Sequence, residues 1–512
     1  MRIFLKIILI AQFVAYIFSC CAFGQNQERV SKYQISLNLT QTSHVMAGGI
    51  GASWHANGPN VIYYPDLIKR DNRACKGSAY GGNPPLTPEY TKAWEDIINH
   101  AKWLGLDFIR VEVAVSMWEP EREKFTWESE EMKTLYRILD HCKKNNVDVY
   151  MAVMWQGVAW NSFPGICNLQ SSPKSVEDFA IGYATLIDEL VNNRGYKCIH
   201  WLTVTNEPGM EHGWWTNAEK KPESIMPAMR ATRKELDKRG LTNVAMCGSD
   251  GHGLTMAGLD PNDSSVGALS VHNYDGEAPI KMFRENVKIA REVNKPFFLA
   301  EFGRFFMANF EGDLMAMGGP RSEAPKSYKE QLLNADKILN GINEGVDGFN
   351  RWSFTNRGDL DGQWQLVRTW NPNLWDFYKN VIPEPVPYYS FGIISRFASK
   401  HSEILTTKSD SGNYVVTAIK SPKGETTIYI LNKSDNEIEI SVSLLGLKEN
   451  MLLNKYQVTE QEILKNDFKM NPLKTFDLKK KENILTDKLP SRSITTYSSY
   501  KLMQNEAGIM DN

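Results

Sequence analysis

The segment 296–303, PFFLAEFG, is a short apolar run that ends in a single carboxylate, Glu301. Its apolar residues occupy both faces of an extended chain, which is typical of a parallel strand covered by helices on each side. The segment 199–208, IHWLTVTNEP, is built in the same way and ends in Asn206 and Glu207. Both segments therefore predict parallel strands of an α/β fold that carry a glutamate at their carboxyl ends.

Further apolar strands alternate with amphipathic helices along most of the chain. The predicted strands are 46–53, 108–113, 147–155, 199–206, 243–249, 268–274, 296–301 and 346–354, and the predicted helices are 88–104, 130–145, 176–193, 224–239, 278–293 and 327–344. Eight strands in this alternation predict a closed (β/α)8 TIM barrel over 46–401. An open doubly wound sheet is the alternative, but no glycine-rich phosphate loop follows the first strand.

The regions outside the barrel have other patterns. Residues 1–24 combine a basic start, an apolar run and small residues at the end, which predicts a secretory signal peptide. Residues 25–45 contain an alternating strand that is expected to join a C-terminal β-sandwich over 402–502, where short strands and turns recur. Residues 503–512 predict a tail.

Two destinations are consistent with the N-terminus. Cleavage after residue 24 predicts a secreted or periplasmic protein, whereas cleavage between Ser19 and Cys20 would leave a lipoprotein anchored through Cys20 at the cell surface. We favour simple secretion because Phe18 fits a lipoprotein cleavage site poorly. No later segment is apolar enough to predict a membrane span.

Composition and cysteine spacing exclude several classes of function. The 512 residues include 58 basic and 60 acidic side chains, so the basic excess that nucleic-acid binding needs is missing. Five widely spaced cysteines follow the signal and do not form a disulfide framework; Cys75 and Cys167 lie in loops and could pair. Cys142, Cys198 and Cys247 are expected to be small buried residues. No Cys/His spacing resembles a zinc site, and no metal or cofactor is expected.

The two strand-end glutamates carry the predicted chemistry. They end strands four and seven of the barrel, so both are expected to face its catalytic end. Glycoside hydrolysis requires two carboxylates across a sugar, one protonated to assist the leaving oxygen and one ionised. Simpler explanations are a loop position for Glu207 and a structural ion pair between Glu301 and Arg110. The joint placement of the two glutamates favours the catalytic interpretation.

These motifs resemble those of the clan A glycoside hydrolases, the retaining β-glycosidase barrels that include families 5, 30 and 39. In that clan the glutamate of Asn-Glu-Pro on strand four is the acid/base and the glutamate that ends strand seven is the nucleophile. The resemblance assigns these roles to Glu207 and Glu301. It also implies substrate-binding or supporting roles for Arg110, Asn206, His272, Tyr274 and Trp352.

The resemblance carries two finer expectations. The glycine-rich segment 46–53 and the ending 489–497 look more like family 30, and strand three ends Met154-Trp155-Gln156 without the histidine often found in family 5. Within the site, Arg110, Asn206 and Tyr274 are expected to keep Glu301 ionised. Glu207 has no cation in its own motif and is expected to hold its proton to higher pH.

Four further residues are candidates for sugar contacts because they follow strand ends. Trp155 and Gln156 end strand three, and Trp54 and His55 follow strand one. The leading hypothesis is a secreted retaining β-glycoside hydrolase that acts on a β-linked polysaccharide or oligosaccharide. The alternative is a non-catalytic carbohydrate-binding protein on a glycosidase-like barrel, and the presence of both glutamates speaks against it.

Overall fold

The structure is a computed structural model that describes residues 31–56, 82–155, 157–166, 168, 170–209, 215–256, 258–304, 326–356, 364–371, 374 and 376–502. The predicted signal peptide with Cys20, the tail 503–512, Gln156, Cys75 and Cys167 lie outside these residues. Cys142, Cys198 and Cys247 are free thiols, of which Cys142 and Cys247 are buried.

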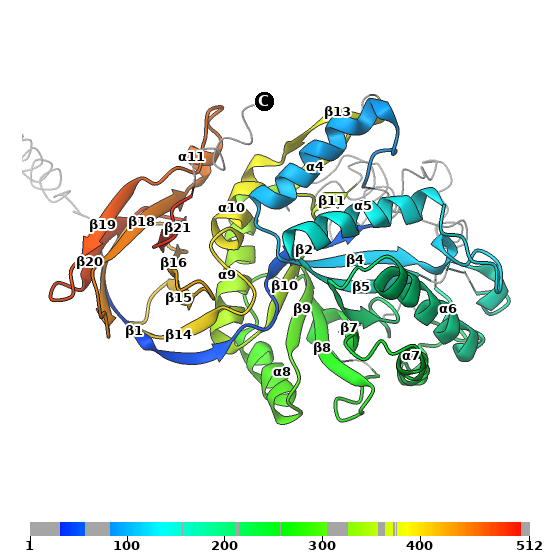
Figure 1. The fold of residues 1–512 in the computed structure, drawn as a ribbon. Coiled ribbons are helices and arrows are strands. Elements are labelled where there is room, and N and C mark those ends of the chain that lie inside the picture. The colour runs from blue at the N-terminus through cyan, green and yellow to red at the C-terminus, as the bar shows by residue number, and fades with distance from the viewer. Residues whose placement is uncertain are drawn as a thin grey trace, which may run out of the picture.

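A parallel barrel forms the larger part of the molecule (Figure 1). Its strands are β2 (Ile50–Ala52), β3 (Trp54–His55), β4 (Phe108–Ala114), β5 (Asp148–Trp155), β6 (Ile199–Thr203), β7 (Ala245–Gly251), β8 (Val266–Asn273), β9 (Phe297–Phe302) and β10 (Gly348–Arg351). They are hydrogen-bonded in the order β2-β10-β9-β8-β7-β6-β5-β4-β3. Because β2 and β3 are two halves of one strand broken at Ser53, the first strand pairs with both β10 and β4, and the barrel closes. The predicted TIM barrel is confirmed.

Helices surround the barrel and alternate with its strands. They are α4 (Thr91–Trp103), α5 (Glu130–Asn145), α6 (Val176–Asp188), α7 (Met226–Lys238), α8 (Ile280–Glu292), α9 (Tyr328–Glu344) and α10 (Pro385–Ser395). Short turns of helix are η1 (Pro88–Tyr90), η2 (Val115–Met117), η3 (Ala159–Asn161), η4 (Glu189–Asn193) and η5 (His252–Leu254). The local sequence defines helix ends: Ser129 caps α5 by accepting a hydrogen bond from the Met132 amide, and Asn146 ends it in the left-handed conformation.

The barrel interior is layered. Three aromatic rings fill its lower part, since the ring centroids of Phe108, Trp201 and Phe298 lie 5.0 to 5.3 Å from one another. One step further along the strands the interior becomes polar, with Arg110 and Asp250 both fully buried. Buried charge is costly unless it is paired, so the change from aromatic to polar marks the end of the barrel where a site is expected.

The second part is an all-β sheet with its own apolar core. Its strands are β1 (Ser31–Val45), β14 (Glu403–Ser409), β15 (Tyr414–Lys420), β16 (Thr426–Asn432), β17 (Ile438–Leu445), β18 (Met451–Val458), β19 (Lys474–Leu478), β20 (Ile484–Leu489) and β21 (Ser493–Ser498). A one-turn helix, α11 (Glu460–Ile463), follows β18. Strand β1 lies between β14 and β17, so the N-terminal strand joins the C-terminal sheet. A β-sandwich beside the barrel agrees with the predicted fold class.

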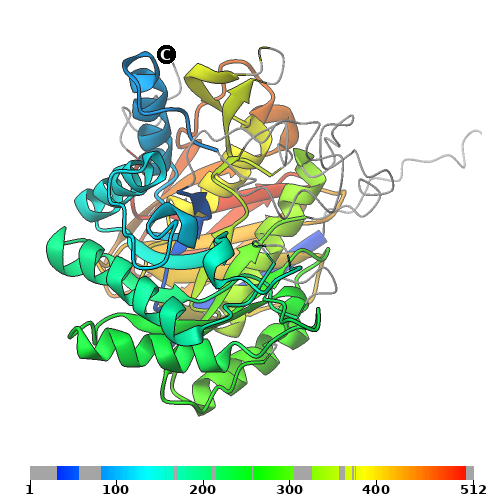
Figure 2. The same cartoon turned by 90° about the vertical axis from the view of Figure 1, so that its right-hand side faces the viewer.

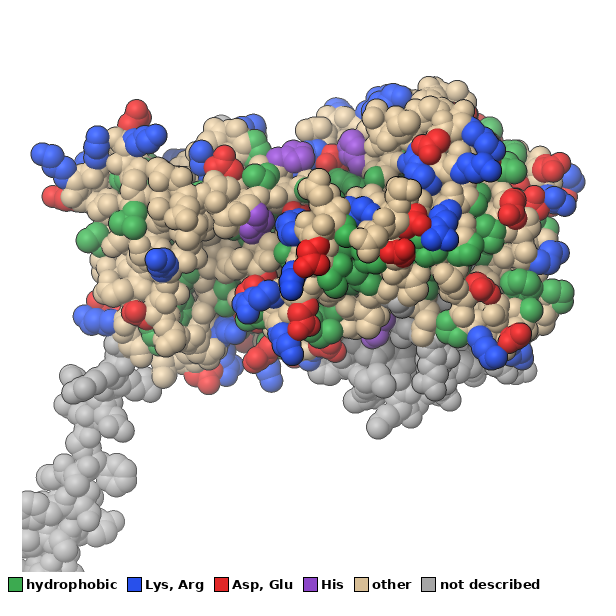
Figure 3. Space-filling model, turned by 90° about the horizontal axis from the view of Figure 1, so that it is seen from below, with side chains coloured by type: hydrophobic (Ala, Val, Ile, Leu, Met, Phe, Trp, Pro, Cys, Tyr) green, Lys and Arg blue, Asp and Glu red, His purple; other side chains and the backbone are tan. Residues whose placement is uncertain are grey.

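The sheet packs on helices of the barrel, as Figures 1 and 2 show from two sides. Thr417 donates a hydrogen bond to the Leu339 carbonyl of α9, and Tyr429 donates one to the Ile394 carbonyl of α10. On the face seen in Figure 3, acidic and basic side chains are interspersed. Among the described residues no helix is long and apolar enough to cross a bilayer.

One region differs from the sequence prediction. No helix or strand is predicted for the segment 355–387, but it contains strands β11 (Thr355–Asn356), β12 (Val367–Asn371) and β13 (Asp376–Pro383), which form a small sheet, and the start of α10. Helix α10 is buried on nearly all sides because it lies between the barrel and the β-sheet. An element covered all round has no polar face, so it lacks the amphipathic period that reveals a helix.

Gly51 allows the first strand to close the barrel. A Cβ atom at this position would lie 1.5 Å from the Phe108 carbonyl oxygen. We expect Gly51→Ala to lower the free energy of unfolding by about 1–3 kcal/mol, because the backbone of β4 would have to move. Denaturant unfolding measures the loss. The matched control is Gly276→Ala, whose Cβ would meet only the end of the Arg304 side chain at 3.6 Å; equal stability of the two variants would contradict the prediction.

Candidate active site

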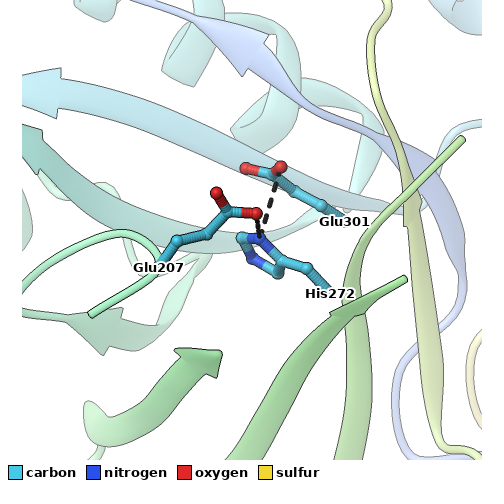
Figure 4. A group of neighbouring side chains, drawn as sticks. All are labelled: Glu207, His272 and Glu301. Carbon is cyan, nitrogen blue, oxygen red and sulfur yellow. Dashed lines mark hydrogen bonds and ion pairs between the residues drawn. The ribbon is translucent and has the colours of Figure 1, made fainter. Parts of the chain in front are cut away.

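Three side chains meet at the carboxyl end of the barrel, as Figure 4 shows. Glu207 follows β6 on a residue with φ of +42°, Glu301 belongs to β9, and His272 reaches between them from β8. His272 Nδ1 lies 2.9 Å from Glu207 Oε1 and 3.4 Å from Glu301 Oε2. A set of ligand atoms, one from each of the three side chains, lies within 4.8 Å of one another. The two strand-end glutamates therefore face one common space.

Glu301 is held by two donors. Its Oε1 accepts a hydrogen bond of 2.6 Å from Arg110 Nη1, and its Oε2 accepts one of 2.7 Å from the Tyr274 hydroxyl. Its side chain is 4% exposed. The ion pair between Arg110 and Glu301, which was the simpler explanation for a glutamate at this position, is thus present. The same carboxylate also faces His272 and Glu207.

Arg110 joins the polar residues of the barrel into one network. Its guanidinium donates to Glu301, Glu112, Asn206 and twice to Asp250, so each of its five N–H groups has an acceptor. Asn206 Oδ1 accepts its bond from Arg110 Nη2 at 2.7 Å. Asn206 is therefore connected to Glu301 indirectly, through the guanidinium of Arg110, whereas the Tyr274 hydroxyl donates its hydrogen bond to Glu301 directly.

Of the two candidates from the first strand, His55 belongs to this network and Trp54 does not. His55 Nδ1 pairs with the Glu112 carboxylate, and its ring meets the Trp352 ring edge-on with centroids 4.9 Å apart. Trp54 points the other way: it is fully buried, packs on Phe354 and donates a hydrogen bond to Asn83. Successive strand residues face opposite sides, so the structure does not bring Trp54 to the carboxylates.

The structure does not describe the side chains of the two candidates at the end of the third strand, Trp155 and Gln156. For Trp155 the structure describes the backbone, which pairs with Ala114 at the end of β5. Gln156 lies outside the described residues.

Sequence reasoning missed three residues of the cluster. Asp250 is the second-to-last residue of the fifth barrel strand, β7, and Glu112 lies two residues after Arg110 on β4. His252 follows β7, with Nδ1 3.2 Å from Glu207 Oε1. Asp250 had a signal that could have found it, because it is a carboxylate at the end of a strand, as Glu301 is. His252 had none, since a histidine in a loop has no pattern that distinguishes it.

The protonation of the two glutamates differs from the expectation. Burial opposes ionisation of Glu207, but hydrogen bonds from His252 and His272 outweigh it and lower the pKa of Glu207 to about 2. Burial raises the pKa of Glu301 to about 7, against the opposing charges of His272 and Arg110. The predicted order, with Glu207 holding its proton to higher pH, is thereby reversed. The physical reason is that His272 and the missed His252 donate hydrogen bonds to Glu207, while the Glu112 carboxylate lies near Glu301.

His272 carries the proton that Glu207 lacks. Burial disfavours its cation, but the carboxylates of Glu301, Asp250 and Glu207 together raise the pKa of His272 to about 10. The hydrogen-bonded pair of His272 and Glu207 thus holds one transferable proton at neutral pH.

A protein-family model matches this region of the chain. Residues 73–319, just under half of the sequence, match cellulase (glycosyl hydrolase family 5). The matched segment contains both Glu207 and Glu301. No curated protein sequence matches the chain.

Solved structures share the whole architecture at low sequence identity. The catalytic domain of the family 30 xylanase C from Talaromyces cellulolyticus is 16% identical, with a TM-score of 0.60 over 91% of this chain and 99% of that one. An endo-β1,6-glucanase is 15% identical, with a TM-score of 0.57 over 91% and 94%. A conserved exported protein from Bacteroides fragilis is 13% identical, with a TM-score of 0.59 over 91% and 99%. These likenesses establish the fold, a barrel with its accompanying β-sheet.

The family model and the fold agree with the resemblance inferred from the sequence motifs. The matched model is that of family 5, whereas the xylanase with the same fold belongs to family 30, and both are families of clan A. The chain is therefore a glycosidase with the clan A fold.

Proposed function

We propose that the protein is a secreted, retaining β-glycoside hydrolase that cleaves a β-linked polysaccharide or oligosaccharide by double displacement. Glu301 is the nucleophile and Glu207 the acid/base. The observation that carries the proposal is the spacing of the two carboxylates, whose ligand oxygens lie within 4.8 Å of each other. Retaining enzymes place their carboxyl groups about 5–5.5 Å apart, whereas inverting enzymes leave about 6.5–9.5 Å for a water molecule.

In the first step Glu301 attacks the anomeric carbon. A bond forms between a Glu301 oxygen and that carbon while the glycosidic C–O bond breaks. Arg110 and Tyr274 hold Glu301 in place through their hydrogen bonds of 2.6 and 2.7 Å. The leaving oxygen takes the proton that Glu207 shares with His272, so the product leaves as an alcohol.

In the second step a water molecule takes the place of the leaving group, while the other sugar is still bound to Glu301. Glu207 accepts a proton from that water, whose oxygen attacks the anomeric carbon and releases Glu301. The proton returns to the pair of Glu207 and His272, which restores the resting state. His252, with a side chain 42% exposed and Nδ1 3.2 Å from Glu207, lies between this pair and solvent.

The competing role as a non-catalytic carbohydrate-binding protein has less support. Sugar binding alone does not call for two carboxylates that share one buried cationic network, because burying such a network is costly. Trp352, which the clan resemblance places beneath the cleaved sugar, packs against His55 beside the network. Secretion rests on the predicted signal peptide, with a lipid anchor on Cys20 as its alternative.

The acid/base role predicts a leaving-group effect. Glu207→Ala should slow hydrolysis of glycosides with poor leaving groups by about 10²–10⁴-fold, because the departing oxygen lacks a proton donor. Activated aryl glycosides should form the intermediate nearly as fast as before, and azide should restore their turnover. Glu285→Ala, an exposed residue of α8 paired with Lys281, is the control and should keep full activity. Equal losses on both substrate types without azide rescue would contradict the role.

The nucleophile role predicts a covalent intermediate. Hydrolysis is first detected on a panel of aryl β-glycosides and β-linked polysaccharides. The 2-deoxy-2-fluoro derivative of the preferred sugar should then label Glu301, as peptide mass spectrometry can show, and Glu301→Gln should not be labelled. Proton NMR should detect the β-anomer as the first product. The α-anomer as first product would refute double displacement, and a panel without hydrolysis would favour the binding role.

The charge network predicts an alkaline activity range. Because Glu301 must be ionised to attack and its pKa is raised to about 7, kcat/KM should fall as pH decreases through about 7. The pKa of His272 near 10 should keep the acid proton in place up to about that pH. The measurement is the pH profile of kcat/KM, with circular dichroism at each pH to exclude unfolding. An acidic limb below pH 5 would show that Arg110 and Tyr274 keep Glu301 ionised after all.

A further inference from the structure

Asp250 occupies a position that the mechanism above does not use. It lies one residue before the end of β7, is fully buried, and has a φ of +55°, in the left-handed region that aspartate enters more readily than most residues. Its backbone carbonyl accepts a hydrogen bond of 3.1 Å from the Glu207 amide. The chain conformation at Asp250 is therefore connected directly to the backbone that presents Glu207.

The Asp250 carboxylate has partners on three other strands. Oδ2 accepts hydrogen bonds from Arg110 Nη2 at 2.8 Å and Nε at 3.2 Å, and Oδ1 accepts from the Tyr150 hydroxyl at 2.6 Å and the Ser270 hydroxyl at 2.5 Å. His272 Nε2 lies 3.6 Å from Oδ2. The carboxylate is thus immobilised and contacts both cations of the site.

Each of those cations faces one of the two glutamates. Arg110 uses Nη1 on Glu301 while Nε and Nη2 contact Asp250. His272 uses Nδ1 on Glu207 while Nε2 faces Asp250. Asp250 therefore faces nitrogen atoms of both cations that the two glutamates do not contact. Because it is fully buried, it acts through its neighbours and not on a substrate.

We propose that Asp250 is a positioning residue whose negative charge keeps His272 protonated and orients the permanently charged Arg110, so that these two cations face Glu207 and Glu301 respectively. The proposal rests on the proposed function for its catalytic consequence. It adds a third carboxylate to the machinery, one that the two-glutamate mechanism does not include.

Several charged groups surround the pair of Asp250 and His272. His272 is faced by Asp250 from β7, Glu301 from β9 and Glu207 from the loop after β6. Asp250 is faced by Arg110 from β4, Tyr150 from β5 and Ser270 from β8. Two more groups complete the set: Glu112, which accepts a hydrogen bond from Arg110, and His252, which is hydrogen-bonded to Glu207. Within it, burial opposes ionisation of Asp250, and Arg110 and His272 outweigh burial to lower its pKa.

The test is Asp250→Asn, which keeps the side chain's shape and removes its charge. In protein labelled with ¹⁵N-histidine, NMR follows the titration of His272, assigned through His272→Gln. With Asp250 neutral, the imidazolium loses a stabilising anion, so the His272 midpoint should fall by about one pH unit or more. The basic limb of the kcat/KM profile should move down with it, and kcat should fall by about 100-fold with KM changed less than about threefold.

Ser270→Ala is the matched control. It removes one hydrogen bond from the same carboxylate and keeps the charge, so the His272 midpoint and the basic limb should stay in place. An unchanged His272 midpoint in folded Asp250→Asn would overturn the proposal, as would an equal shift in Ser270→Ala. If Asp250→Asn does not fold, Asp250→Ser, which leaves room for water, undergoes the same titration with the same two outcomes.

The NMR titration keeps this proposal separate from the proposed function. If the wild-type protein hydrolyses no glycoside, the proposed function fails, and the His272 midpoint still decides whether Asp250 holds the imidazolium. If hydrolysis is found and the midpoint does not move, the glycosidase mechanism stands and the role of Asp250 falls.

Discussion

The buried guanidinium of Arg110 is the interaction on which the site depends. It lies at the centre of the barrel with no exposed surface, and all five of its N–H groups have acceptors. A buried cation is tolerated only when it is paired and hydrogen-bonded. Conversely, without Arg110 the carboxylates of Glu112, Asp250 and Glu301 would remain buried without their shared partner. The buried arginine therefore requires the carboxylates, and the buried carboxylates require the arginine.

The network contains more carboxylates than permanent cations, and this imbalance shapes its chemistry. Glu112, Asp250 and Glu301 contact one arginine, and Glu207 lies beside Glu301. Ionising all four carboxylates is opposed by their mutual repulsion. His272 relieves the repulsion by holding a proton between Glu207 and Glu301, at 2.9 and 3.4 Å. The interacting groups titrate as a set and not as isolated residues. A proton that is held but can be transferred is what general acid catalysis requires.

The rest of the molecule supplies rigidity around this cluster. The aromatic layer of Phe108, Trp201 and Phe298 fills the barrel below it, so that end of the interior is closed by side chains. On the outside, α9 and α10 are covered by the β-sheet whose first strand along the chain is β1 and whose last is β21. The sheet contacts the helices that follow the last two barrel strands, β9 and β10, and it thereby supports the part of the barrel that carries Glu301.

The barrel, the accompanying β-sheet and the strand-end positions of Glu207 and Glu301 could all be predicted from the sequence. Apolar strands that end in carboxylates are a local pattern, and the barrel topology brings such ends together. Which groups face each other across the barrel could not be predicted in this way, because it depends on how the strands pair. The pairing register shifts between Ser249 and Gly251 and between Val271 and His272, and such irregularities re-aim side chains in a way that no strand pattern reveals. The contacts of Asp250 and His272, the two histidines on Glu207, and the reversed order of the glutamate pKa values follow from that register. The same holds for α10, whose burial on nearly all sides comes from a sheet formed by distant parts of the chain.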